Sequence, residues 1–176
     1  MRCTRRGPAW HTWSPSDVSR PAGTVCGVTA GLAHCAQLER AYLDAPCNET
    51  LQLSINISER CADISLVAQP AHHHAAGAVH GSYYFKLLDD AAYFAANSVV
   101  EDVFVLTASF SIQLLRPVVG GTLRAHGEVV RVGRNMIFAD AVLTDDGGRE
   151  LARGSGLCAP SEMKLASVPA YAGGEP

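Results

Sequence analysis

The sequence predicts a single α+β domain in which an antiparallel β-sheet wraps around one long helix. Three observations predict this fold class. Residues 82–98 are mostly apolar and repeat their apolar side chains at helical spacing. From residue 102 onward, apolar and polar residues alternate in four stretches joined mostly by tight, glycine-containing turns. The apolar stripe of the helix is too wide to stay in water, so the sheet must cover it.

The composition limits the class of protein. The chain has 176 residues, 48% hydrophobic and 18% charged, which suits one globular domain with a sizeable core. A net charge of -3 gives no basic field for nucleic acid or an anionic membrane, and no apolar run is long enough for a transmembrane helix. The six cysteines lack C-x-x-C spacing, which indicates reduced thiols. We therefore expect a cytoplasmic protein that binds neither nucleic acid nor membranes.

The two ends of the chain differ from its centre. Residues 1–33 carry four arginines in the first twenty positions, a single acidic residue and three prolines, without a sustained period. We expect a disordered extension there; an organellar targeting peptide is the alternative, although the prolines disfavour an amphipathic helix. The domain is then predicted over residues 34–166, with a loose tail at 167–176.

The first elements of the domain are a short helix and a strand region. Leu38, Ala41 and Tyr42 lie at helical spacing, and Pro46 ends that helix. Residues 51–69, LQLSINISERCADISLVAQ, alternate as either a strand pair or one long bent strand.

The central helix is predicted over residues 82–98, with Ser82 as the candidate cap. Its apolar stripe consists of Tyr84, Leu87, Leu88, Ala91, Ala92 and Ala95.

The period changes to two after this helix. In residues 102–117, alternation predicts one face with Leu106, Ala108, Phe110, Ile112 and Leu114, and an opposite face with Thr107, Ser109, Ser111 and Gln113. Turns at 120–121, 133–135 and 145–148 then separate three further strands.

Two segments carry a family resemblance. Residues 77–92, GAVHGSYYFKLLDDAA, and residues 114–156, beginning LLRPVVGG, resemble the hotdog-fold acyl-CoA thioesterases of the phenylacetate-degradation (PaaI-like) type. That family shows G-x-x-H-G-G, an acidic residue nine positions after the histidine, R-P-x-x-x-G, G-R and a D-x-x-G hairpin. The resemblance covers roughly residues 36–160, and it implies a hotdog fold and thioester hydrolysis.

The residue types in this pattern suit the hydrolysis of a thioester. The Gly81 N–H lies where a turn enters a helix, so it can stabilise the oxyanion of a thioester carbonyl. Asp89 would act as the nucleophile or as the general base on water. Asp90 points about 100° away on the helix, so both carboxylates should not face one cleft, and Asp90 is expected to be solvated or ion-paired.

The spacing of Gly81 and Asp89 has a consequence for assembly. Eight helical residues separate them by roughly 12 Å along the axis, too far for one carbonyl to touch both within a chain. If both act, the site must combine Gly81 of one chain with Asp89 of another. The resemblance likewise implies a homodimer or a homotetramer, a dimer of dimers, with active sites at subunit interfaces.

The resemblance also implies roles for further positions. His74 stands where the family carries Asn or Gln, and Ser82 replaces the second glycine of H-G-G. Thr107 matches a hydroxyl that helps to hold water, and His80 shapes the turn more often than it transfers protons. The expected substrate-binding set is His80, Ser82, Tyr83, Tyr93, Arg124 and Arg134.

Two of these expectations have alternatives. Arg124, Arg131 and Arg134 would contact the phosphates of coenzyme A, although a solvated sheet edge explains them equally well. Tyr83 is available to line an acyl pocket, but it could equally belong to the core.

The run His72-His73-His74 suggests a metal site, yet its segment has no Asp, Glu or Cys to complete the ligands, and the family is metal-free.

The sequence therefore predicts an acyl-CoA thioesterase that needs no cofactor, since coenzyme A is part of its substrate. An acyl-CoA-binding sensor on the same fold is the non-enzyme alternative, and Asp89 argues against it. A hotdog hydratase or dehydratase is the other alternative, but its D-x-N-P-x-H type of motif is not found.

Overall fold

The computed structural model describes residues 31–173 of the chain. Its helices and strands follow the predicted order, and the region at 51–69 is a strand pair. The elements are α1 (Leu32–Leu43), β1 (Leu53–Ser58), β2 (Cys61–Val67), α2 (Gly81–Asn97), β3 (Val103–Leu114), β4 (Thr122–Val132), β5 (Ile137–Thr144), β6 (Glu150–Lys164) and α3 (Pro169–Ala172), with short 3₁₀ turns at Pro46–Asn48, Pro70–His72 and Leu165–Ser167.

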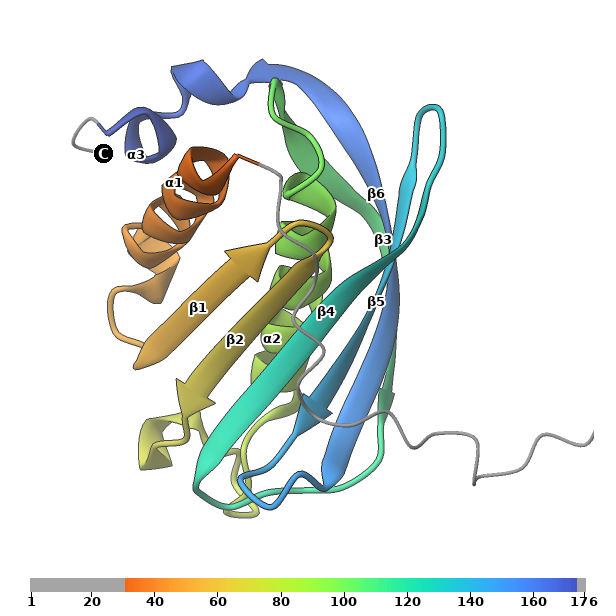
Figure 1. The fold of residues 1–176 in the computed structure, drawn as a ribbon. Coiled ribbons are helices and arrows are strands. Elements are labelled where there is room, and N and C mark those ends of the chain that lie inside the picture. The colour runs from red at the N-terminus through yellow and green to blue at the C-terminus, as the bar shows by residue number, and fades with distance from the viewer. Residues whose placement is uncertain (1–30, 174–176) are drawn as a thin grey trace, which may run out of the picture.

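The strands form one six-stranded antiparallel sheet in the order β1-β2-β4-β5-β6-β3, so β1 and β3 are its edges. The sheet curves around α2, which lies along its inner face (Figure 1). This is the predicted α+β architecture of a long helix wrapped by an antiparallel sheet.

The core forms between α2 and the sheet. All six residues of the predicted stripe on α2 are buried. The helix approaches β4 most closely at Gly127, where a Cβ would collide with the carbonyl oxygen of Ala91 and lie 2.7 Å from the nitrogen of Ala92. A glycine is therefore required at this contact between helix and sheet.

Strand β3 departs from the predicted alternation. Thr107 pairs with Cys158 and Ser109 pairs with Leu157, so Ala108 is an extra residue in a β-bulge. Before the bulge, Val105 and Thr107 point inward, and Leu106 is 54% exposed. After it, Phe110 and Ile112 point inward and pack on the core. The prediction that Leu106 shares a face with Phe110 is wrong, because the bulge shifts the alternation by one residue.

The two ends of the described chain pack on each other. The buried His34 of α1 contacts the Tyr171 hydroxyl of α3 through its Nδ1 at 2.8 Å, and Arg40 donates to the Tyr171 carbonyl oxygen at 2.9 Å. Figure 1 shows α3 against α1. Residues 167–176 are predicted to be a loose tail, whereas residues 169–172 form a helix on the domain. Most of the extension predicted over 1–33 lies outside the described residues.

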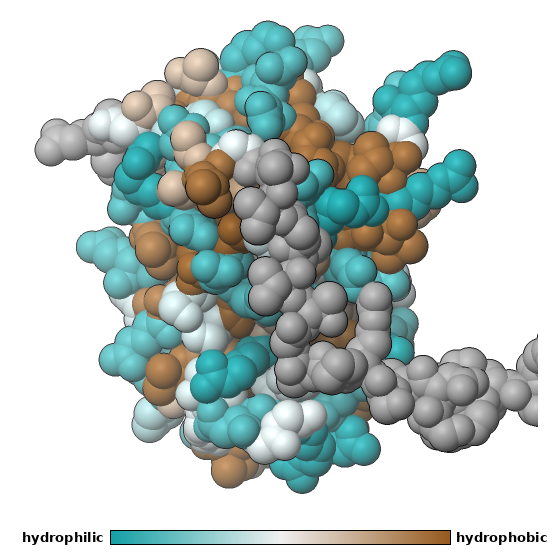
Figure 2. Space-filling view, viewed as in Figure 1, coloured by the Kyte–Doolittle hydropathy of each residue, from teal (hydrophilic) through white to brown (hydrophobic). Residues whose placement is uncertain are grey.

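The outer surface is mixed in polarity. Figure 2 shows hydrophobic residues gathered at the upper right, where the hairpin of β4 and β5 lies. The exposed apolar side chains of this hairpin are Val130, Val132, Met136 and Phe138. In the described part of the chain, no helix is long and apolar enough to cross a membrane.

Candidate active site

Asp89 lies in the third turn of α2 and faces a cavity of about 490 Å³. The cavity lies between α1, α2, the first residues of β3 and the segment that leads to α3. The Thr107 hydroxyl of β3 donates to Asp89 Oδ1 at 3.0 Å. Within residues 31–173, no group donates a hydrogen bond to Oδ2. One carboxylate oxygen is therefore held in place, and the other is open to the cavity.

The environment of Asp89 favours its protonated form. Burial raises the pKa of Asp89 above its ordinary value, and the neighbouring Asp90 adds to this effect. The hydrogen bond from Thr107 and the charge of Lys86 lower the pKa and oppose the shift. A carboxyl group with a raised pKa is a stronger base than an ordinary aspartate, as general-base chemistry near neutral pH requires.

Asp90 faces the same cavity as Asp89, which corrects the prediction that the two carboxylates would not share a cleft. The prediction of an ion pair is confirmed, since Lys86 Nζ lies 2.8 Å from Asp90 Oδ2. The Tyr42 hydroxyl donates to the same oxygen at 2.9 Å. Both carboxylates reach one cavity because α1 and the turn after it lie over α2 and extend the cavity around the helix surface.

Gly81 begins α2 and lines a second pocket of about 620 Å³, together with His74, His80, Ser82 and the end of β3. Its N–H has no acceptor within residues 31–173. The side chain of Leu114 lies close enough that a Cβ at position 81 would be 3.2 Å from its Cδ1. The structure thus places an unpaired helix N-terminal donor, without a side chain, at the wall of an open pocket.

The helix cap is His80 and not Ser82, which corrects the prediction. His80 Nδ1 accepts the Ser82 N–H at 3.1 Å and lies 2.8 Å from the Ser82 hydroxyl. Histidine is an unusual N-cap, and sequence reasoning chose the serine because hydroxyl caps are commoner. His80 is thus part of the turn, in keeping with the structural role expected of it.

His74 lies in the Gly81 pocket, where its exposed ring is 6.3 Å from the ring of His80. Its Nδ1 accepts the Ala76 N–H at 3.1 Å, so Nε2 is the ring nitrogen that can donate outward. The structure therefore brings His74, His80, Gly81 and Ser82 together.

The two pockets have no residue in common. Asp89, Thr107 and Tyr93 line the first, and the Gly81 group lines the second. Within the chain, the predicted site residues are therefore divided between two separate pockets, as the helix spacing predicts.

The two tyrosines of the predicted set lie in different places. Tyr93 is one turn after Asp89, lines its cavity, and donates from its hydroxyl to Asn97 Oδ1 at 3.2 Å. Tyr83 lines neither pocket, because its ring packs on the buried ring of His72 at 4.5 Å.

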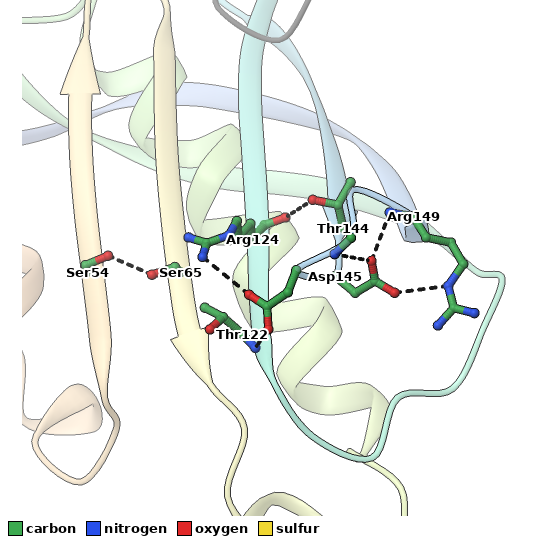
Figure 3. A network of polar contacts seen from close by, with 9 residues as sticks. Ser54, Ser65, Thr122, Arg124, Thr144, Asp145 and Arg149 are labelled. Carbon is green, nitrogen blue, oxygen red and sulfur yellow. Dashed lines mark hydrogen bonds and ion pairs between the residues drawn. The ribbon is translucent and has the colours of Figure 1, made fainter.

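The two predicted arginines lie away from both pockets. Arg124 is exposed between buried neighbours on β4, so it points away from α2, and its Nη2 is 3.4 Å from Asp146 Oδ1 (Figure 3). Arg134 is exposed in the turn between β4 and β5 and lines neither pocket.

The histidine run is divided among different environments. His72 is buried under Tyr83, and His74 is exposed. Within residues 31–173, no group of three or more His, Cys, Asp or Glu side chains could hold a metal ion.

Sequence reasoning missed three residues at these pockets. Tyr42 and Lys86 line the Asp89 cavity, and Arg116 lines the Gly81 pocket. The spacing of Lys86, three and four positions before the two aspartates, is a signal that could have placed it there. Tyr42 gave no such signal, because its position depends on how α1 packs.

Comparisons with known proteins agree with this fold. Residues 76–152 match the model of the thioesterase superfamily. A search of the curated proteins gives no match. Among solved structures, the chain is similar to PaaI from the phenylacetic acid degradation operon of Escherichia coli, with a TM-score of 0.70, 20% identity, and coverage of 77% of this chain and 99% of PaaI.

Two further structures are similar. A mutant of the phenylacetic acid degradation protein PaaI of Thermus thermophilus has a TM-score of 0.61 and 21% identity, covering 66% of this chain and 100% of its own. A putative esterase of Mycobacterium tuberculosis has a TM-score of 0.63 and 24% identity, and the match covers 67% of this chain and 98% of the esterase. At these identities the structures establish the hotdog fold alone. The predicted resemblance is confirmed by PaaI among the similar folds and by the thioesterase superfamily match over residues 76–152.

Proposed function

We propose that this hotdog-fold chain, which matches the thioesterase superfamily over residues 76–152, hydrolyses an acyl-CoA thioester to a free acid and coenzyme A. The observation that carries the proposal is the Asp89 carboxylate, fixed through one oxygen by Thr107 and open to a largely apolar cavity through the other. An apolar cavity beside a basic carboxylate suits an acyl group whose carbonyl carbon is attacked at the cavity wall.

Asp89 would act on the thioester carbonyl in one of two ways. As a general base, it takes a proton from water while the water oxygen bonds to the carbonyl carbon. As a nucleophile, it forms an anhydride that water then cleaves. In both routes the carbon–sulfur bond breaks, and the coenzyme A thiolate takes a proton. The Gly81 N–H would stabilise the oxyanion, and the scheme needs no cofactor.

The site would be completed by a second copy of the chain. Strand β3 is a sheet edge, with the Asp89 cavity at its beginning and the Gly81 pocket at its end. Antiparallel pairing of two β3 edges would bring Thr107 of one chain towards Leu114 of the other. Leu106 and Leu114 are 54% and 57% exposed on this edge, so apolar contacts would support such a dimer.

The substrate-binding roles follow from this arrangement. His74, His80 and Ser82 would face the reacting thioester from the Gly81 side, and Tyr93 would line the acyl cavity. Arg124 and Arg134 lie outside both pockets and would contact coenzyme A only beyond the reacting centre.

The test is a panel of aromatic and aliphatic acyl-CoA thioesters, assayed by release of free thiol with wild type and Asp89→Asn. Asparagine can accept the Thr107 hydrogen bond but cannot act as base or nucleophile, so turnover should fall by at least roughly a hundredfold. Asp140→Asn is the matched control, because Asp140 is exposed on β5 and lines neither pocket.

Near-normal hydrolysis by Asp89→Asn would remove Asp89 from its role. Binding of acyl-CoA without hydrolysis by the wild type would instead favour the sensor alternative.

A further inference from the structure

The Asp89 cavity holds a second polar group that the proposed reaction leaves unexplained. Lys86 Nζ is 2.8 Å from Asp90 Oδ2, and the Tyr42 hydroxyl donates to the same oxygen at 2.9 Å. The ammonium group also lies 5.3 Å from the centre of the Tyr42 ring, in cation–π contact. Lys86 thus has two contacts, one with α2 and one with α1, and the Tyr42–Asp90 hydrogen bond holds its two partners together.

Lys86 supplies positive charge to a cavity whose other charged side chains are acidic. Of the described residues that line the cavity, Lys86 alone has a basic side chain, whereas Asp44, Asp89 and Asp90 are acidic. The other titratable groups that face Asp89 are phenols and thiols: Tyr42, Cys47, Tyr93 and Tyr171 around the cavity, and Cys158 on β6 behind Thr107. None of these supplies a positive charge.

Two adjacent carboxylates in a half-buried cavity oppose each other's ionisation. Lys86 precedes Asp89 by three residues and Asp90 by four, so its ammonium group lies on the same helix surface as both. Because it binds Asp90 directly, it neutralises that charge without occupying Asp89 Oδ2. The oxygen that would react stays open, and the repulsion across the pair is offset.

We propose that Lys86 is a positioning residue for the hydrolysis: held by Asp90 and Tyr42, its ammonium group keeps the neighbouring Asp89 carboxylate ionised and leaves its Oδ2 open to the substrate. The role rests on the proposed function of Asp89. In this arrangement Asp90 is the anchor of Lys86, and Tyr42 brings α1 into the same network.

The experiment compares wild type, Lys86→Met, Lys86→Arg and the double variant Lys86→Met/Asp90→Asn. The control is Lys164→Met, which changes the chain's other lysine, an exposed one, in the same way. Circular dichroism first establishes that each variant is folded. The dependence of kcat/KM on pH is then measured by thiol release, and the Asp89 carboxyl is titrated by ¹³C NMR, with its resonance assigned by its loss in Asp89→Asn.

Lys86→Met should move the acid limb of the kcat/KM profile, and the Asp89 titration, to higher pH by about one unit. Lys86→Arg should restore most of the wild-type profile, because it keeps the positive charge. The double variant should titrate closer to wild type than Lys86→Met does, since removing Asp90 removes the repulsion that Lys86 offsets. Lys164→Met should overlay the wild type.

An unchanged Asp89 titration in Lys86→Met would overturn this role even if Asp89→Asn abolishes hydrolysis. A double variant that titrates like Lys86→Met would also overturn it, because Asp90 would then not be the charge that Lys86 offsets. The NMR titration needs no turnover, so a failure of the proposed function would be recognised separately, as an inactive wild type.

Discussion

At the scale of single residues, Asp89 lies in surroundings that oppose its charged form. Its carboxyl group is half-buried beside a second carboxylate, and its pKa is raised mainly by burial. A group with a raised pKa in the folded state binds its proton more tightly there than in the unfolded chain. Stability therefore falls as pH rises from the ordinary aspartate pKa to the raised one, and stays lower above it.

Asp89→Asn should consequently stabilise the fold near neutral pH, while it abolishes the proposed activity. The asparagine is neutral at every pH, so the folded state no longer holds a desolvated carboxylate. Thermal unfolding from pH 3 to pH 8 checks this: the melting temperature of the variant should exceed that of wild type at pH 7, and the difference should vanish below about pH 4. A variant less stable than wild type at pH 7 would contradict the sign of the shift.

The sequence predicted the position of Asp89, but it did not predict the cavity shared with Asp90 or the helix cap. The spacing of nine from His80 selected Asp89, and the structure places it beside Thr107, as the motif suggests. The shared cavity of Asp90 was not predictable, because helix pitch describes one helix and the cavity depends on where α1 lies. The His80 cap was missed because it depends on a side-chain rotamer.

At the scale of elements, the contact of α2 with β4 limits what position 127 can hold. Gly127 faces the backbone of Ala91 and Ala92, and a peptide backbone cannot move aside as a flexible side chain can. This contact sets how deeply the helix lies in the sheet, and therefore the position of Asp89, which precedes Ala91 by two residues on the same helix.

Gly127→Ala should lower the free energy of unfolding by about 3 kcal/mol, because the added methyl group forces α2 away from the sheet. Urea unfolding followed by circular dichroism measures the effect. Gly120→Ala is the control, since a Cβ at position 120 meets nothing within 4 Å. Equal stabilities for the two variants would show that helix and sheet adjust without cost.

Helices and strands were predicted correctly where the pattern lies within one short segment of the sequence. The periods of 3.6 and 2 identified α2 and the strands, because each period depends on which side of one element is buried. The bulge in β3 could not be predicted, because it is defined by pairing with β6, which lies far along the chain. Helix α3 is a single turn that is held by its contacts with α1, so its own sequence gives little signal.

At the scale of the whole molecule, the two half-sites lie at opposite ends of one edge strand. Under the proposed function, their separation would require two chains, in which each chain gives Asp89 to one site and Gly81 to the other. The motif spacing already suggested this sharing. The exposed edge of β3 supplies the surface for it.

Mixing two inactive variants tests the sharing directly. Asp89→Asn and Gly81→Pro should each be inactive as homodimers, since proline removes the proposed oxyanion donor. After dissociation and re-association, half of a random mixture is heterodimers, each with one undamaged site, so activity should return to about a quarter of the wild-type value. Sedimentation confirms the dimer, and a mixture that stays inactive would place each site within one chain.

The bulge at Ala108 also bears on how this chain can change length. Because Ala108 is surplus to the pairing of β3 with β6, a deletion of this one residue would leave Thr107 opposite Cys158 and Ser109 opposite Leu157. Every remaining side chain of the strand would keep its face of the sheet. A single-residue gap, normally disruptive inside a strand, could therefore be accepted here. In an alignment with any relative that lacks the bulge, the gap belongs at position 108. Placed there, the gap leaves the alignment of Thr107 and Asp89 unchanged.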